Sequence, residues 1–212
     1  MLGALVALMV GAAAPTRLPP TDQCRGDPEF DRFRRKLEHA VASRDNQKLA
    51  PLMSPQVRLS FGGGIWFSKF RNYEQSGPGG DGMWQNALWD EMAKVLRLGC
   101  GTVRGDAGNH YRAWPAMYVG GESLEAPDTW VSLPGAILWR QSGRHAHIAQ
   151  RLPAWTVLHE LGQGYSSDMK VRTPKGRVGF VPREQMRGLL DYRLIAQRVD
   201  GRWQVTAFVA GD

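Results

Sequence analysis

Long hydrophobic runs are scarce in this sequence of 212 residues. The apolar run at residues 1–14 is too short to cross a bilayer, because a membrane-spanning helix needs about 20 apolar residues. It ends in small residues, as a signal peptide does before its cleavage site, although no Lys or Arg precedes it. We therefore expect a soluble periplasmic or secreted protein, with no transmembrane span in its mature form, whose residues 1–20 are signal peptide and linker.

Cysteine is also scarce, since Cys24 and Cys100 are the only two in the chain. Each lies just outside a predicted helix, where loops could bring the two thiols together. An even pair in an oxidising compartment favours one disulfide. Two free buried thiols are the alternative.

The usual signatures of catalysis are absent. The glycine-rich stretches at residues 62–64 and 77–82 lack the Lys-Ser/Thr pair of a phosphate-binding P-loop. Asp90 and Glu91 are adjacent in a predicted helix, where neighbouring side chains point in different directions and cannot address one bond. No nucleophile elbow is present. We expect no enzymatic activity.

The histidines suggest a metal site only weakly. His145 and His147 lie on one side of an extended segment, and His159 lies on a nearby predicted strand. Zinc needs three or four converging ligands, and the segment after His159 lacks the second histidine of a metalloprotease motif. We therefore expect neither a metal nor a cofactor.

Charge is biased towards one sign, with a formal net charge of +7. This excess would attract nucleic acid, anionic lipid or anionic wall polymers without specificity. No signature of specific nucleic-acid binding accompanies it. The densest basic cluster lies on a predicted helix and is interpreted as a solvated face; its members are Arg32, Arg34, Arg35 and Lys36.

Helical signals dominate the first part of the chain. Asp27 and Pro28 are typical of a helix start, and apolar residues then recur at helical spacing up to Val41. A short helix is expected near residues 49–53, a strand at 56–61, and an amphipathic helix at 84–96 that ends before Gly99. Residues 102–114 are expected to be irregular.

Strand signals dominate from about residue 129. Short apolar segments recur with turn residues between them, which is typical of a small barrel or sandwich; they lie at residues 130–133, 136–139, 148–151, 156–161, 169–173 and 177–181. Asp200-Gly201 then predicts a final hairpin of residues 192–199 and 202–209. This hairpin could close the barrel or return to pair with the strand around Val57.

Residues 131–186 contain a series of short motifs: Ile137-Leu138-Trp139-Arg140, Leu152, Trp155-Thr156-Val157, Lys170-Val171 and Gly176-x-x-Gly179-Phe180-Val181. In this order they resemble the bacterial Src-homology-3 (SH3) domain. The tryptophan that the family places before its Lys-Val pair is Asp168 here, and its Gly-Pro is Ser142-Gly143. The whole arrangement resembles exported proteobacterial proteins that carry such a domain, which implies an architecture and no particular activity.

Aromatic residues in this segment are the candidate ligand contacts. Aromatic-lined grooves on SH3-like barrels dock extended peptides, and Trp139, Trp155 and Tyr165 could line one. The alternative is that a small barrel needs its tryptophans as core.

The sequence thus predicts an α+β protein. An α-rich N-terminal region at residues 21–125 would precede a small SH3-like β-barrel with a C-terminal hairpin at residues 129–212. The predicted function is non-catalytic binding or scaffolding, with peptidoglycan or a cell-envelope protein as partner. An accessory domain of a divergent cell-envelope hydrolase, or such a hydrolase itself, is the alternative.

Overall fold

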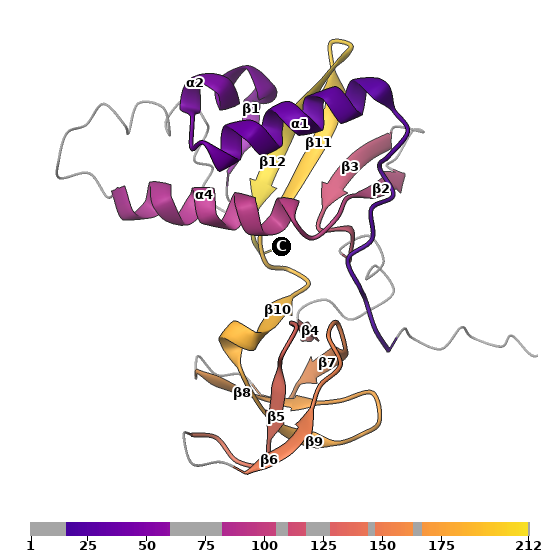
Figure 1. The fold of residues 1–212 in the computed structure, drawn as a ribbon, viewed down its shortest axis with the longest axis vertical. Coiled ribbons are helices and arrows are strands. Elements are labelled where there is room, and N and C mark those ends of the chain that lie inside the picture. Colours follow the sequence, from indigo (N-terminus) through magenta and orange to yellow (C-terminus); the bar gives the residue numbers. More distant parts are fainter. Residues whose placement is uncertain are drawn as a thin grey trace, which may run out of the picture.

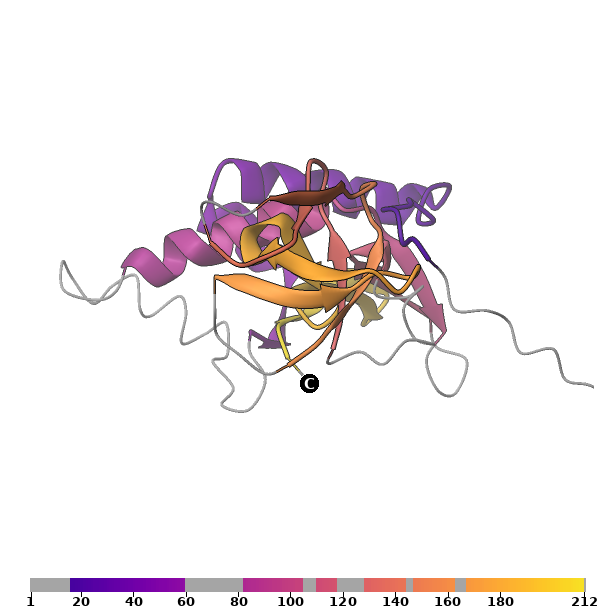
Figure 2. The same cartoon turned by 90° about the horizontal axis from the view of Figure 1, so that it is seen from below.

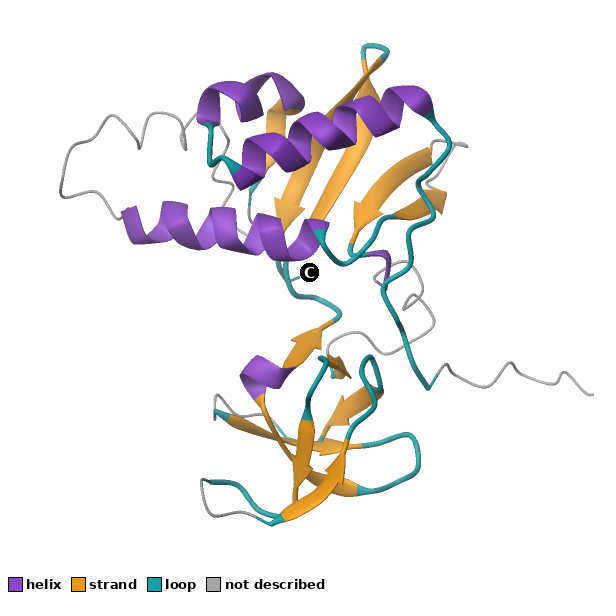
Figure 3. Cartoon of the chain, in the orientation of Figure 1, coloured by secondary structure: helices purple, strands orange, loops and turns teal. Residues whose placement is uncertain are grey.

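The structure is a computed structural model that describes residues 16–59, 82–104, 110–117, 128–143, 147–162 and 167–211. These residues form two β-sheets that lie one above the other along the long axis (Figure 1). The long helices gather on the first sheet, whereas the second has only a short helical turn beside it (Figure 3). Seen from below, the second sheet lies in front of these helices (Figure 2).

Helix α1 (Pro28–Ala42) begins where the sequence predicts it. The Asp27 carboxylate accepts hydrogen bonds from the backbone N–H groups of Glu29 and Phe30 at 3.0 and 3.1 Å, and Pro28 needs no N–H partner at the first position. One face of α1 is buried, namely Phe30, Phe33, Leu37, Ala40 and Val41. Two short elements follow it, α2 (Asn46–Leu49) and the 3-10 helix η1 (Ala50–Leu52).

The first sheet joins strands from the first part of the chain to the C-terminal hairpin. Its order is β1 (Met53–Arg58), β12 (Arg202–Val209), β11 (Arg193–Val199), β3 (His110–Trp114) and β2 (Gly101–Arg104). Strands β11 and β12 form the predicted hairpin, and its turn residues Asp200 and Gly201 have φ angles of +49° and +76°, as a type I′ turn requires. Strand β1 pairs with β12 in parallel, with Met53 opposite Val205. Of the two alternatives for the hairpin, pairing with the Val57 strand is therefore the one observed.

Helices α1 and α4 (Gly82–Leu96) cover one face of this sheet (Figure 1). Phe30 lies at the centre of the shared core, with ring centroids 5.5 Å from Trp114 and 4.9 Å from Trp203. Leu194 and Phe208 are fully buried in the same cluster. The hairpin therefore supplies apolar surface that the helices need in order to fold.

The second sheet has seven strands. Its order is β10 (Met186–Gly188), β4 (Thr129–Ser132), β7 (Val157–Glu160), β8 (Asp168–Arg172), β9 (Val178–Pro182), β5 (Ile137–Trp139) and β6 (Ile148–Arg151), and the turn η3 (Arg183–Gln185) precedes β10. Leu138, Leu158 and Val171 are fully buried in its core. The short strands that the sequence predicts between residues 129 and 182 are present.

The predicted fold class is nevertheless wrong. The described chain is mostly β, and its first part forms a five-stranded sheet with helices on it instead of an α-rich region. Strands β2 and β3 lie in the stretch expected to be irregular. The hairpin completes this first sheet and does not follow an SH3-like barrel. Within the described residues no pairing joins β6 to β10, so the second sheet is not a closed barrel.

A segment that we call the strap, residues 16–26, connects the two sheets (Figure 1). At one end, the backbone N–H of Leu18 donates to the Trp155 carbonyl at 2.9 Å, and that of Val157 to the Thr16 carbonyl at 3.0 Å. At the other end, the backbone N–H of Gln23 donates to the Cys100 carbonyl at 2.7 Å. The strap thus fastens the second sheet to the segment that follows α4.

Candidate functional site

A basic groove of about 700 Å³ opens between α1, the α2–η1 segment and the tip of the β11–β12 hairpin. We use the name basic groove for this site throughout. Its cationic side chains come from three separate parts of the chain, namely Arg32 and Lys36 of α1, Lys48 of α2, and Arg202 of β12.

One exposed stripe of α1 forms the longest wall of the basic groove. Glu29, Arg32, Lys36 and His39 all line it. Because an α-helix has 3.6 residues per turn, side chains spaced by three and four positions lie on one face. Buried Phe33 lies between them and links the wall to the core.

The other walls are partly apolar. Pro51 and Leu52 of η1 lie on one side, and Trp203 and Gln204 of β12 lie on another. Trp203 is half-buried, and its ring packs edge-on against Phe30. The basic groove therefore combines charged side chains with apolar surface.

Trp203 is held in place by two guanidinium groups. The Arg198 guanidinium carbon lies 5.4 Å from one ring centroid of Trp203, and that of Arg112 lies 5.7 Å away. Arg112 also lies 5.4 Å from the ring of Phe30. Such cation–π contacts favour one orientation of the indole, so this wall is preorganised.

Two of the charged groups at the basic groove are neutralised by neighbours. Lys48 forms an ion pair with Asp45 at 2.9 Å, and Glu29 forms one with Arg198. Within the described part of the chain, Arg32, Lys36 and Arg202 form no ion pair. These three exposed cations leave the groove with an excess of positive charge.

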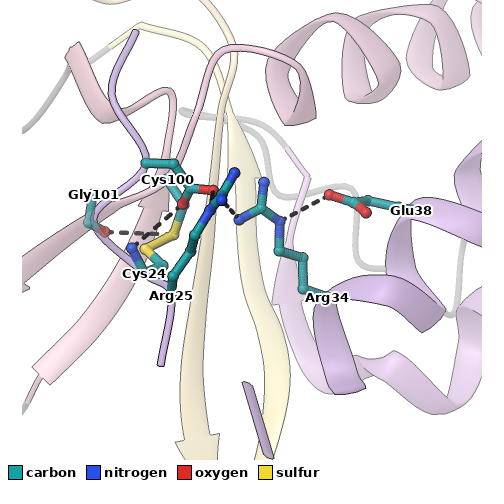
Figure 4. Close-up of polar contacts among 7 residues, drawn as sticks. Cys24, Arg25, Arg34, Glu38, Cys100 and Gly101 are labelled. Atoms are coloured by element: carbon teal, nitrogen blue, oxygen red, sulfur yellow. Dashed lines mark hydrogen bonds and ion pairs between the residues drawn. A yellow bond between two sulfur atoms is a disulfide. The ribbon is translucent and has the colours of Figure 1, made fainter. Parts of the chain in front are cut away.

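A second hollow, of about 570 Å³, lies beside the strap and differs in its charge balance. Arg34 donates to Asp22 at 2.7 Å and to Glu38 at 2.8 Å, and Arg25 donates to Asp22 at 3.1 Å. Figure 4 shows Arg34 extending from α1 towards the disulfide, with Glu38 on its other side. The carboxylates in this hollow already have cationic partners.

The ionisation of this cluster is coupled to its hydrogen bonds. Burial alone would raise the pKa of Asp22, but hydrogen bonds from Arg34 and Arg25 outweigh burial and lower that pKa. Burial would likewise lower the pKa of Arg34, but its bonds to Glu38 and Asp22 raise it. Such mutual stabilisation is typical of a structural ion-pair cluster.

The predicted disulfide is confirmed. Cys24 and Cys100 are bonded, with their Cα atoms 5.6 Å apart, and both are buried. The bond joins the strap to the segment between α4 and β2. It indicates that the protein forms where thiols can be oxidised.

The aromatic residues predicted as ligand contacts lie on the second sheet and its loops. Trp139 is half-buried on β5, opposite Phe180 of β9. Trp155 is half-buried in the turn before β7, where its backbone binds Leu18 and its side chain packs on the cluster that includes Val131. Tyr165 lies outside the described residues. The structure therefore gives Trp155 a packing role between strap and sheet, and the role of all three in ligand binding stays a prediction.

The two acidic candidates have different ion-pair partners. Asp90 of α4 pairs with Arg44 at 2.7 Å, whereas Glu91 pairs with Lys94 at 2.7 Å. The described residues include no group of three or more potential metal ligands. His145 and the glycines at 62–64 and 77–81 lie outside the described residues.

Sequence reasoning missed the basic groove. The cluster from Arg32 to Lys36 was interpreted as one solvated face, but the structure divides it, because Arg32 and Lys36 line the groove while Arg34 pairs with Asp22. The helical spacing of Glu29, Arg32, Lys36 and His39 could have indicated a shared stripe. Arg202 lies 170 positions after Arg32 in the sequence. It reaches the basic groove only because β12 is part of the first sheet.

Comparison with known proteins adds little to this description. No family model and no curated protein matches the sequence. A cystatin-like protein from Caulobacter vibrioides is similar at 10% identity and a TM-score of 0.27, over 86% of this chain and 85% of that one. A protein from Xanthomonas campestris, described as an association domain of calcium/calmodulin-dependent protein kinase II, has 10% identity and a TM-score of 0.30 over 94% of this chain and 96% of that one. These scores are too low to establish a common fold or a shared function.

Proposed function

We propose that the protein is a non-catalytic binding protein of an extracytoplasmic compartment, and that the basic groove holds an anionic ligand. The observation that carries this proposal is the convergence of Arg32, Lys36 and Arg202 on one groove without acidic partners among the described residues. Grooves lined by charge of one sign concentrate ligands of the opposite sign.

Periplasmic or secreted localisation is part of the proposal. The Cys24–Cys100 disulfide supports an oxidising compartment, and the apolar residues 1–14 support export. None of the helices that the structure describes is long and apolar enough to span a bilayer. The partner that we propose is an anionic component of the cell envelope, either peptidoglycan or an envelope protein.

A divergent hydrolase, or an accessory domain of one, is the alternative and has less support. An active site would be expected to combine a pocket with titratable groups whose pKa values are perturbed by burial. Burial raises the pKa values of Asp191 and Tyr192 and lowers the pKa of Arg187. Arg187 lies on β10 and the other two residues follow that strand, and none of the three lines the basic groove.

A small anion titration tests the proposed function. We would titrate pyranine, a fluorescent aromatic trisulfonate, with the disulfide-bonded protein at about 0.15 M ionic strength, where distant surface charges are screened. The double variant Arg32→Glu/Lys36→Glu should bind pyranine at least about fivefold more weakly than the wild type, which corresponds to about 1 kcal/mol.

The matched control is Arg35→Glu/Lys175→Glu. It makes the same change in net charge at exposed residues of α1 and of the β8–β9 turn, neither of which lines the basic groove. Its pyranine affinity should stay within about twofold of the wild type, since distant exposed charges are screened. If both double variants lost the same pyranine affinity, net charge alone would attract the anion and the proposal would be refuted.

A further inference from the structure

We infer that the occupant of the basic groove is an extended peptide segment with acidic residues at alternate positions. This inference rests on the proposed function and deepens it by naming the chemistry of the ligand. It draws on the shape of the groove, the spacing of its cations and the mixture of side chains that line it.

The basic groove is elongated along α1. Its lining on this helix extends from Glu29 to His39, a length of about 15 Å at 1.5 Å per residue. A compact anion would contact only part of such a wall. A linear ligand would contact all of it.

The spacing of the cations matches an extended polypeptide. Arg32 and Lys36 are separated by four residues, or about 6 Å along the helix axis. In a β-strand, side chains on the same side repeat every two residues, which is about 6.6 Å. Two acidic side chains at alternate positions of an extended segment can therefore reach Arg32 and Lys36 together.

The walls across the groove suit the rest of such a segment. Arg202 offers a further cation at the hairpin tip, while Leu52 and Trp203 offer apolar contact to side chains that do not face α1. The amide of Gln47 can donate to a peptide carbonyl and accept from a peptide N–H. A peptide uses all of these groups.

A chain of phosphates would use fewer of them. It has no apolar side chains to place against Leu52 and Trp203, and no N–H donor for the amide oxygen of Gln47. The mixed lining thus favours a peptide over polyphosphate.

Fluorescence anisotropy with two isomeric peptides tests this inference. Both are labelled heptapeptides of four glutamates and three leucines. One alternates the two residue types, and the other has the order Glu-Glu-Leu-Leu-Glu-Glu-Leu, in which no two glutamates lie two positions apart. Because the isomers have the same charge, only a spacing-dependent site can separate them. We expect the disulfide-bonded protein to bind the alternating peptide at least fivefold more tightly than this isomer.

The same variants locate the binding site. Arg32→Glu/Lys36→Glu should weaken binding of the alternating peptide at least tenfold, and Arg35→Glu/Lys175→Glu should change it less than twofold. All of these positions are exposed, and circular dichroism of each variant should match the wild type. If a variant does not fold, the single substitutions Lys36→Gln and Arg35→Gln give the same comparison.

The outcomes separate the two proposals. Equal affinity for the two isomers, or tighter binding of short-chain polyphosphate that competes with the peptide, would overturn the peptide inference and leave anion binding intact. If neither pyranine nor either peptide responds to Arg32→Glu/Lys36→Glu, both the inference and the proposed function fail.

Discussion

The disulfide between Cys24 and Cys100 joins the strap to the segment after α4 across a sequence separation of 76. The strap also binds the second sheet through Leu18 and Trp155. The disulfide and these backbone hydrogen bonds therefore link the second sheet, through the strap, to the segment after α4.

The first prediction concerns this disulfide. Replacing both Cys24 and Cys100 by serine should lower the free energy of unfolding by about 4 kcal/mol, because the unfolded chain loses a constraint on a loop of this size. Chemical denaturation of the variant and of the oxidised wild type measures the difference. The reduced wild type is the control and should resemble the variant. If all three proteins unfold at the same denaturant concentration, the bond does not stabilise the fold.

The second prediction concerns the close approach of the strap to Gly99. A methyl group at Gly99 would lie 2.0 Å from the Thr21 carbonyl oxygen, and the φ angle of Gly99 is +74°. Gly176 has a φ of +77° but nothing within 4 Å of such a methyl group. Gly176→Ala should therefore lower the free energy of unfolding by about 1 kcal/mol, from backbone strain alone. Gly99→Ala should lower it by about 2 kcal/mol more, because its methyl group also meets the strap.

Thermal or chemical unfolding of these two alanine variants gives a direct comparison. Since the φ angles of the two glycines are nearly equal, any additional loss of stability in Gly99→Ala reports on packing against Thr21. Equal losses at the two positions would contradict the close approach of the strap.

Helix α1 and the β11–β12 hairpin illustrate what the sequence could and could not predict. Helix α1 and the hairpin were predictable because their signals are local, namely Asp27-Pro28 at a helix start and Asp200-Gly201 at a turn. The partner of the hairpin was not, since a turn signal fixes which two strands pair and says nothing about which sheet they join. The error in fold class follows from grouping the hairpin with residues 129–212 and from expecting no strands at residues 102–114.

Strand β3 was missed for a related reason. Arg112 lies on the helix-covered side of the sheet, between Phe30 and Trp203, so the strand does not alternate simply between apolar and polar residues. The basic groove was missed because Lys48 and Arg202 meet only through the parallel pairing of β1 with β12. Contacts so distant in sequence leave no local pattern.

The third prediction concerns Asp191, which follows β10 between the two sheets. Burial raises its pKa, although the backbone N–H of Gly188 and the charge of Arg187 act in the opposite direction. Because the folded state holds the proton more tightly than the unfolded state, stability is highest below the unfolded pKa of about 3.9 and decreases as the pH rises through the folded pKa.

Asp191→Asn removes this titration and keeps a side-chain oxygen for the Gly188 N–H. The variant should therefore gain stability relative to the wild type as the pH rises from about 3 to 7, across the unfolded pKa. Denaturation over this pH range measures the trend. A difference in stability that is independent of pH, or that shrinks on going to pH 7, would contradict a raised pKa.

The fourth prediction has the opposite sign and concerns Asp22. Its pKa is lowered, because hydrogen bonds from Arg34 and Arg25 outweigh the effect of burial. The stabilisation is therefore present above the unfolded pKa of about 3.9 and is lost as the pH falls through the folded pKa. Asp22→Asn should be less stable than the wild type at pH 7, and the two should converge in acid. If the two proteins were equally stable at pH 7 and differed in acid, the lowered pKa of Asp22 would be contradicted.

The proposal that the basic groove binds an anion depends on residues from distant parts of the chain acting together. Arg202 tests this most directly, because it reaches the groove only through the fold and forms no ion pair among the described residues. The decisive measurement is the pyranine affinity of Arg202→Gln beside that of Lys175→Gln, an exposed cation at a turn of the second sheet. Arg202→Gln should bind pyranine about threefold to fivefold more weakly, and Lys175→Gln should bind it as the wild type does. Equal affinities in the two variants would contradict the account.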